Sequence, residues 1–148
     1  MRETKDIMFV IDYIFGKGVH SLLSIEKFRP IFSKRTGKIK QLFYDNALFG
    51  TFRPNGTIAL TSDAYRILSK SRVFKKNTAV IKADQVNFVK NSSSVFVSNI
   101  KELGKNVFVG SDVFIVTPED YLIGIGKATI SYLQIKRFKS GLCIKNRG

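Results

Sequence analysis

The sequence predicts an α+β fold made of two small domains, an α+β domain at residues 1–71 and a small mixed β-barrel at residues 72–148. Two observations predict this division. The first half begins with a long segment of helical periodicity that hairpin signals follow, whereas the second half contains closely spaced short strand patterns with little helix. The chain has 148 residues and is 44% hydrophobic, so it can bury a core without disulfides or metals.

The first expected element is an amphipathic helix from about Lys5 to Phe15. Its apolar residues recur at helical spacing: Ile7, Met8, Ile11, Ile14 and Phe15. Thr4 is the expected N-cap, and Gly16 is the expected residue after the last turn. Gly16-Lys17-Gly18 opens a short helical turn that runs to Leu23. We favour helix termination over phosphate binding for these glycines, because no complete phosphate-binding motif follows.

Four strands and a second helix complete the first half. Turn residues separate the strands at Gly37, Asp45-Asn46 and Pro54-Asn55-Gly56. The expected strands are Phe28–Ser33, Lys38–Tyr44, Ala47–Arg53 and Thr57–Leu60. Thr61 or Ser62 then caps a helix.

The second half is expected to contain more strands than helices. The expected strands are Val73-Phe74, Ala79–Ile81, Val95–Val97, Asp112–Thr117, Tyr121–Ser131 and Gly141–Lys145. Asp84–Lys90 predicts one short helix with Val86 and Val89 facing inward, and Asn91–Ser94 predicts a polar loop. Pro118-Glu119-Asp120 predicts the turn of a hairpin. Such closely spaced strands are typical of a small barrel.

Rare residue types exclude several kinds of site. Cys143 is the only cysteine, so an internal disulfide and a multi-cysteine metal site are excluded, and we interpret it as a small buried hydrophobe. His20 is the only histidine, which excludes His-pair metal motifs, and we interpret it as structural. No apolar run approaches the roughly 18 residues that span a bilayer, and the N-terminus differs from a signal peptide. We therefore expect a soluble, cytoplasmic protein without a cofactor.

The most informative property is charge. The chain contains 25 Lys and Arg residues against 11 Asp and Glu residues, a formal net charge of +14. Such an excess usually serves a polyanionic partner, and nucleic acid is favoured over an anionic membrane because no long basic amphipathic helix is present. Three stretches contain basic residues and no acidic residue: residues 27–44, 64–83 and 121–148. These stretches are the expected nucleic-acid contacts.

Several segments, in order along the chain, resemble the C-terminal part of archaeal tRNA-guanine transglycosylases, the archaeosine enzymes. The first three resemble the domain that precedes the PUA domain, and the rest resemble the central hairpin and closing strand of a PUA domain. They are Asp12–Gly18, Ser33–Lys40, Thr51–Thr61, Val113–Val116 with Leu122–Ala128, and Phe138–Lys145. The resemblance implies a pre-PUA α+β domain followed by a PUA-like pseudobarrel.

The sequence departs from the family pattern in three respects. Gly110-Ser111-Asp112 has one residue more than the family's usual Gly-Asp before the first hairpin strand, and Asn91–Ser94 lacks the glycine usual near the RNA. The family's catalytic barrel, with its aspartates and zinc site, has no counterpart in these residues. The adjacent acids Glu119-Asp120 fit a turn better than a catalytic pair. We therefore expect a non-catalytic chain.

Charge and resemblance together predict one set of RNA-contacting residues. They are Lys34, Arg35, Lys38, Lys40, Arg72, Lys75, Lys76, Asn91, Ser92, Ser93, Lys136, Arg137, Lys139, Lys145 and Arg147. Tyr44 and Tyr132 lie beside basic segments and are candidates for base stacking, although core packing is favoured.

The resemblance implies tRNA as the ligand, with the PUA domain near its acceptor end. The resulting hypothesis is a detached RNA-binding portion of an archaeosine-type transglycosylase that works with a separate catalytic chain. The alternative is a stand-alone PUA module in ribosome assembly or RNA handling. A small RNA-modifying or RNA-cleaving enzyme that uses His20 is a third hypothesis, and a membrane binder is a distant fourth.

Overall fold

The structure, a computed structural model, describes residues 2–147, with side chains from Asp6 onward. The chain divides into two compact units, Met1–Phe74 and Lys75–Gly148. The boundary expected from the sequence, after Ser71, lies slightly earlier. Both units combine helices with strands, which confirms the predicted α+β class. Among the described residues, no helix is both long and apolar enough to cross a membrane.

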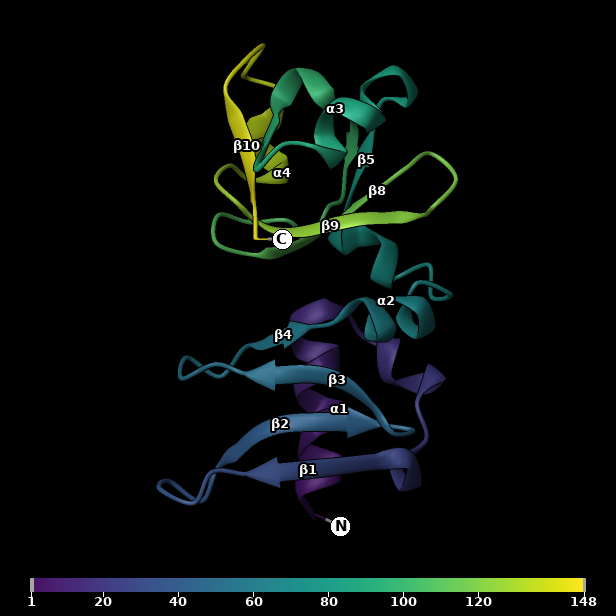
Figure 1. Ribbon diagram of the computed structural model, residues 1–148, viewed down its shortest axis with the longest axis vertical. Coiled ribbons are helices and arrows are strands. Elements are labelled where there is room, and N and C mark those ends of the chain that lie inside the picture. The colour runs from purple at the N-terminus through teal and green to yellow at the C-terminus, as the bar shows by residue number, and fades with distance from the viewer. Residues whose placement is uncertain (1, 148) are drawn as a thin grey trace. The chain divides into compact units, whose positions relative to one another are not determined.

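The first unit is a four-stranded antiparallel sheet with the helix α1 against one face (Figure 1). Its strands follow the order β1-β2-β3-β4, so each pairs with the next one along the chain. The elements are α1 Arg2–Phe15, η1 Val19–Leu22, η2 Ile25–Lys27, β1 Phe28–Phe32, β2 Ile39–Tyr44, β3 Ala47–Phe52, β4 Ile58–Leu60 and α2 Ser62–Leu68. All four strands and both helices expected here are confirmed.

The helix α1 packs on the sheet through a stripe of apolar side chains along one of its faces. Ile7, Ile11 and Phe15 are four residues apart and at most 2% exposed, as a helix packed along one face requires. The helix begins at Arg2, so the expectation that Thr4 is the N-cap is wrong. Arg2 and Glu3 are good helix formers, and the helix extends through them. The expected end is confirmed, since Gly16 has a φ of 130°.

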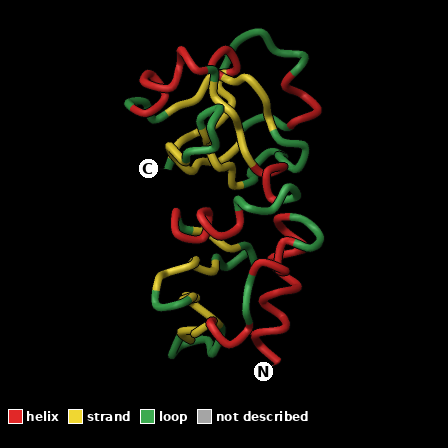
Figure 2. The backbone as a smooth tube through the Cα atoms, turned by 90° about the vertical axis from the view of Figure 1, so that its right-hand side faces the viewer, coloured by secondary structure: helices red, strands yellow, loops and turns green. Residues whose placement is uncertain are grey.

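The two faces of this sheet differ. The face toward α1 contributes buried aromatic rings, and the Phe28 ring meets the rings of Tyr44 and Phe49 at centroid distances of 4.8 and 5.5 Å. On the opposite face the side chains are half-buried or exposed. Within the described part of this unit, no helix covers that second face in either view (Figures 1 and 2).

The second unit is a six-stranded sheet that curls into a half-barrel (Figure 1), as predicted. Its order is β6-β10-β9-β8-β5-β7, and neighbours are antiparallel except for the parallel pair β5 and β8. The strands are β5 Thr78–Ile81, β6 Ser94–Phe96, β7 Ile100–Leu103, β8 Asp112–Val116, β9 Leu122–Ala128 and β10 Leu142–Asn146. The helical segments are η3 Phe74–Asn77, which begins at the last residue of the first unit, η4 Ala83–Gln85, α3 Val86–Lys90, η5 Val97–Asn99 and α4 Tyr132–Ile135.

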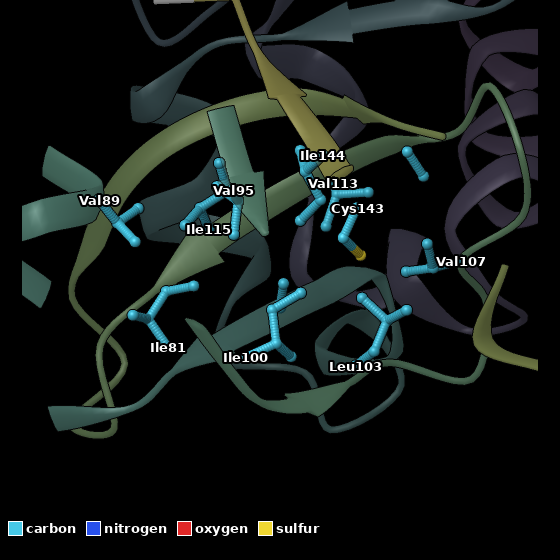
Figure 3. Close-up of a cluster of buried hydrophobic side chains, with 12 residues drawn as sticks. Ile81, Val89, Val95, Ile100, Leu103, Val107, Val113, Ile115, Cys143 and Ile144 are labelled. Atoms are coloured by element: carbon cyan, nitrogen blue, oxygen red, sulfur yellow. The ribbon is translucent and has the colours of Figure 1, made fainter. Parts of the chain in front are cut away.

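The curl of this sheet encloses the unit's core (Figure 3). Val95 from β6, Ile115 from β8 and Ile144 from β10 each have no exposed surface and belong to one cluster. Cys143 lies in the same cluster, and its burial raises the pKa of the thiol to about 11. The interpretation of Cys143 as a small buried hydrophobe is therefore confirmed.

Several local expectations for the second half are wrong. Val73-Phe74 is not a strand, because Phe74 begins η3 and packs its ring 5.7 Å from that of Phe15. Asp84–Lys90 is not one helix but a 3-10 turn followed by α3. The strand expected at Tyr121–Ser131 ends at Ala128, and β7 was not expected, since two charged residues interrupt its apolar pattern.

Candidate nucleic-acid interface

Four of the predicted RNA-contacting cations belong to the β1–β2 hairpin. Lys34, Arg35 and Lys38 lie in its turn, Lys40 lies in β2, and all four side chains are exposed. Among the described residues, no ion pair includes any of them. The hairpin therefore presents four positive charges that remain available to phosphate oxygens.

Hydrogen bonds within the turn fix its backbone. The Ser33 N–H donates to the Lys38 carbonyl oxygen at 2.8 Å, and the Gly37 N–H donates to the Ser33 carbonyl oxygen at 2.9 Å. Gly37 has a φ of 72°, a left-handed conformation that glycine adopts without steric cost. The cations thus extend from a defined loop, which limits the backbone entropy lost when they bind.

A second group of predicted residues meets at the C-terminal end of β10. The Asn146 N–H donates to the Ser93 carbonyl oxygen at 2.8 Å, and Lys145 pairs with Ser94 of β6. Lys145 and Arg147 are exposed on either side of Asn146. The structure therefore joins the predicted polar loop to the predicted basic strand, although the two are far apart in the sequence.

Lys127 on β9 adds a cation that the predicted set omitted. It is exposed and lies directly opposite Lys145 in the β9–β10 register. Cross-strand partners place their Cβ atoms about 4.5–5.5 Å apart, and like charges in that position are destabilising. On its other side Lys127 lies opposite Asp112 of β8, so the three side chains carry a net positive charge that suits an anionic ligand.

Local hydrogen bonds stabilise the conformation of the polar loop. The Ser92 hydroxyl donates to the Ser94 carbonyl oxygen at 2.9 Å and accepts the Ser94 N–H at 3.1 Å. The Asn91 side-chain amide donates to the Asn87 carbonyl oxygen at 2.9 Å. Ser93 is exposed, so among the predicted loop residues its hydroxyl is the best placed to meet a ligand.

Three further predicted cations lie elsewhere in the second unit. Lys136, Arg137 and Lys139 are exposed and follow α4, at the chain segment that enters β10 at Leu142. Lys145 lies near the opposite end of β10, a separation of about 10 Å at the usual strand rise. The structure thus divides the predicted C-terminal basic group into two clusters.

The predicted cations around the domain boundary are less uniform. Arg72 belongs to the first unit, and Lys75 and Lys76 belong to η3. The Lys75 ammonium lies 3.2 Å from an Asp120 carboxylate oxygen, so its charge is partly neutralised. Asp120 has a φ of 69° and stands in the predicted turn, which agrees with a structural role for this acid.

Two residues weighed for other roles are engaged in the first unit. Tyr44 is 7% exposed, and its hydroxyl accepts the Ser24 N–H at 3.0 Å, which agrees with core packing rather than base stacking. His20 has a partner that the sequence did not reveal, because its Nδ1 atom lies 2.7 Å from an Asp12 carboxylate oxygen.

Asp12 ties the end of α1 to the following turn. Its carboxylate accepts the Gly18 N–H at 3.1 Å and the His20 N–H at 2.9 Å. Burial acts to raise the pKa of Asp12, but these two backbone hydrogen bonds and the His20 ring together hold the pKa below its usual value. The arrangement supports the structural interpretation of His20.

Comparison with known proteins identifies both units. Residues 5–73 match the family model described as the patch-forming domain C2 of tRNA-guanine transglycosylase, and residues 77–148 match the PUA domain. The tRNA-guanine(15) transglycosylase of Methanobrevibacter smithii is 28% identical over 146 residues, which cover 98% of this chain and 22% of the relative. The Methanosphaera stadtmanae enzyme of the same name is 31% identical, covering 93% and 21%. The chain spans about a fifth of the length of these relatives.

Solved structures share the fold. A hypothetical protein of the hyperthermophilic archaeon Pyrococcus horikoshii OT3 aligns with a TM-score of 0.73 at 19% identity, covering 98% of this chain and 88% of that one. A PUA domain protein of Aeropyrum pernix K1 aligns with a TM-score of 0.63 at 9% identity, covering 98% and 80%. The chain is thus a PUA-domain protein that is similar, over nearly its whole length, to the C-terminal part of the tRNA-guanine(15) transglycosylases.

Proposed function

We propose that this protein binds tRNA as the RNA-binding portion of an archaeosine-type tRNA-guanine transglycosylase whose catalytic chain is separate. The observation that carries the proposal is the match of both units, in order, to the C2 and PUA domains of that enzyme. The unpaired cations of the β1–β2 hairpin and the Lys127–Lys145 pair supply the attraction to phosphate.

In this proposal, electrostatic contacts with phosphates bind the tRNA and fix its position and orientation. The hairpin cations contact the RNA backbone, and the surface around Ser93, Lys145 and Arg147 receives the part of the tRNA near its acceptor end. Lys136, Arg137 and Lys139 extend the second surface along β10. Phosphate contacts of this kind fix position and orientation without reading sequence, which suits a module that presents a substrate to another active site.

The role proposed for this chain is non-catalytic. The acids Glu119 and Asp120 occupy a turn, and Asp120 is paired with Lys75, so neither resembles a general acid and base poised over a substrate. The chemical step of guanine exchange is assigned to the catalytic chain, and this chain contributes affinity for the substrate.

Reconstitution tests the proposal. A catalytic transglycosylase chain is assayed for guanine exchange on tRNA with the wild-type protein, with Lys34→Ala/Arg35→Ala, and with Lys101→Ala/Lys105→Ala as a control of equal charge change outside the proposed surfaces. We expect the wild type and the control to lower the KM for tRNA, and the hairpin variant to do so less. Equal activity with and without this protein, and no association of the two chains, would contradict the proposal.

The identity of the RNA is tested separately. Crosslinking in cells followed by sequencing of the bound RNA is expected to enrich tRNA over ribosomal RNA. Enrichment of ribosomal RNA would instead favour the stand-alone module that serves ribosome assembly.

A further inference from the structure

The sheet of the first unit has one face that α1 does not cover (Figures 1 and 2). Strand register places Arg29 opposite Phe43, and Phe43 opposite Leu48, in one row across three strands. The next row on the same face contains Ile31, Gln41 and Thr51. Side chains alternate between faces along a strand, so both rows lie opposite the buried residues that contact α1.

The centre of this face is an arginine stacked near an aromatic ring. The guanidinium carbon of Arg29 lies 4.8 Å from the centroid of the Phe43 ring, within the range of a cation–π interaction. Arg29 is exposed and Phe43 is half-buried. The ring orients the guanidinium, and the guanidinium offers a planar, charged surface to solvent.

The residues around this pair suit an anionic ligand that contains planar groups with hydrogen-bonding edges. The residues of this face include the cation Arg29 and no acidic residue, whereas Lys40 alternates with Gln41 and lies on the face toward α1. Within the described residues, the side chains of Gln41 and Thr51 make no hydrogen bond, so both are available to a ligand. The cationic turn follows directly after β1, and Arg29 lies only about 10 Å from the end of that strand at the usual rise.

We propose that this uncovered face binds an unpaired RNA base, stacked on the Arg29–Phe43 pair, while the β1–β2 turn holds the adjoining phosphates. Aromatic rings and arginine planes on an open four-stranded sheet are suited to splayed bases, and Gln41 and Thr51 can meet a base edge. The inference rests on the proposed RNA binding and adds a site that recognises unpaired nucleotides.

Two exposed aromatic residues of the helix in this unit lack these features. Phe9 and Tyr13 are 72% and 83% exposed, but they lie on α1, which also contains Asp6 and Asp12. No cation–π contact between described residues involves either ring. Tyr13 therefore provides a matched control, an exposed aromatic side chain outside the proposed site.

The experiment compares two labelled RNA hairpins that differ only in their unpaired tail. One tail carries adenine bases, and the other has abasic nucleotides with the same phosphates. Affinity is measured by fluorescence anisotropy for the wild type, Phe43→Leu, Arg29→Lys and the control Tyr13→Leu, with thermal unfolding to verify folding. Arg29 is exposed, so Arg29→Lys keeps the charge and the fold while removing the planar group.

We expect the wild type and Tyr13→Leu to prefer the adenine tail roughly five- to thirtyfold, and Phe43→Leu and Arg29→Lys to lose most of that preference. Binding to the abasic hairpin should be the same for all four proteins. If both site variants keep the full preference, or the wild type shows none, the base site is refuted while RNA binding stands. Loss of association with a catalytic chain at unchanged base preference would identify the face as a protein interface and overturn the inference. Failure of the wild type to bind either hairpin would refute RNA binding itself.

Discussion

The two units hold their cations in different ways. In the first unit the charges sit on a hairpin turn beside an uncovered sheet face, where long side chains can spread apart. In the second unit the strand register forces Lys127 and Lys145 into direct opposition on a sheet that closes around its own core. A turn can therefore present several cations with no charged partner opposite them, whereas the register of a sheet fixes which charges face each other, here Lys127 between Lys145 and Asp112.

The largest expected effects test whether each unit depends on its own core. Ile11→Ala removes a fully buried side chain of α1, and Ile115→Ala removes one of β8. Each should destabilise its unit by about 2–5 kcal/mol, because the cavity adds to the lost burial. Hydrogen exchange measures the result, and each variant should lose protection mainly in its own unit. Equal loss throughout the chain would show that the two cores are not independent.

Asp12→Asn tests the tie at the end of α1. The variant should destabilise the first unit by about 0.5–1.5 kcal/mol at neutral pH, because a neutral amide replaces the charged acceptor of two backbone hydrogen bonds, one half-buried and one exposed. The pKa of Asp12 is lowered in the folded state, so the carboxylate's contribution is present above the ordinary value of 3.8 and is lost as pH falls through the folded pKa. Urea unfolding of both proteins from neutral to acid pH should show the difference shrinking below about pH 4. A difference that does not depend on pH would show that ionisation of Asp12 does not matter.

Removing cations from either surface should weaken RNA binding and make the affinity less dependent on salt concentration. Each phosphate contact contributes about 0.7–0.9 to the slope of log affinity against log salt. Lys34→Ala/Arg35→Ala should therefore reduce the slope by up to about 1.4–1.8, and Lys127→Ala/Lys145→Ala should do the same in the second unit. Titrations at several salt concentrations measure both. If the slope falls in only one of the two variants, only the unit that carries those substitutions contacts the RNA phosphates.

The smallest predicted effect concerns Lys127 alone. Lys127→Gln removes both the like-charge opposition to Lys145 and the opposite-charge pairing with Asp112 of β8, so the free energy of unfolding should change by less than about 0.5 kcal/mol while RNA affinity falls. Lys105→Gln is the matched control, an exposed lysine of the same unit, and should change neither quantity. A loss of stability clearly larger than this in Lys127→Gln would show that the pairing with Asp112 dominates and that this lysine stabilises the fold.

Local signals predicted the first unit well. Gly37, Asp45-Asn46 and Gly56 all adopt positive φ at the expected turns, and Thr61 accepts the Ala64 N–H at 3.2 Å as the expected N-cap. These features depend on neighbours within a few residues, which a sequence displays directly.

Contacts between residues far apart in the chain could not be predicted from the sequence. The opposition of Lys127 to Lys145 depends on the β9–β10 register, and the contact between Asp12 and His20 depends on the path of the chain after Gly16. Arg29 was counted in an acid-free stretch, but nothing in the sequence placed its guanidinium over Phe43. The predicted basic group at the C-terminus was divided for the same reason, since its members lie at opposite ends of β10.

The most direct test of the central claim is the affinity of the wild-type protein for tRNA as a function of salt concentration. If cations of both units contact phosphates, log affinity should decline steeply and linearly with log salt. With four or more contacts, the slope should be about −3 or steeper. A flat profile, or no binding to tRNA at low salt, would contradict the account.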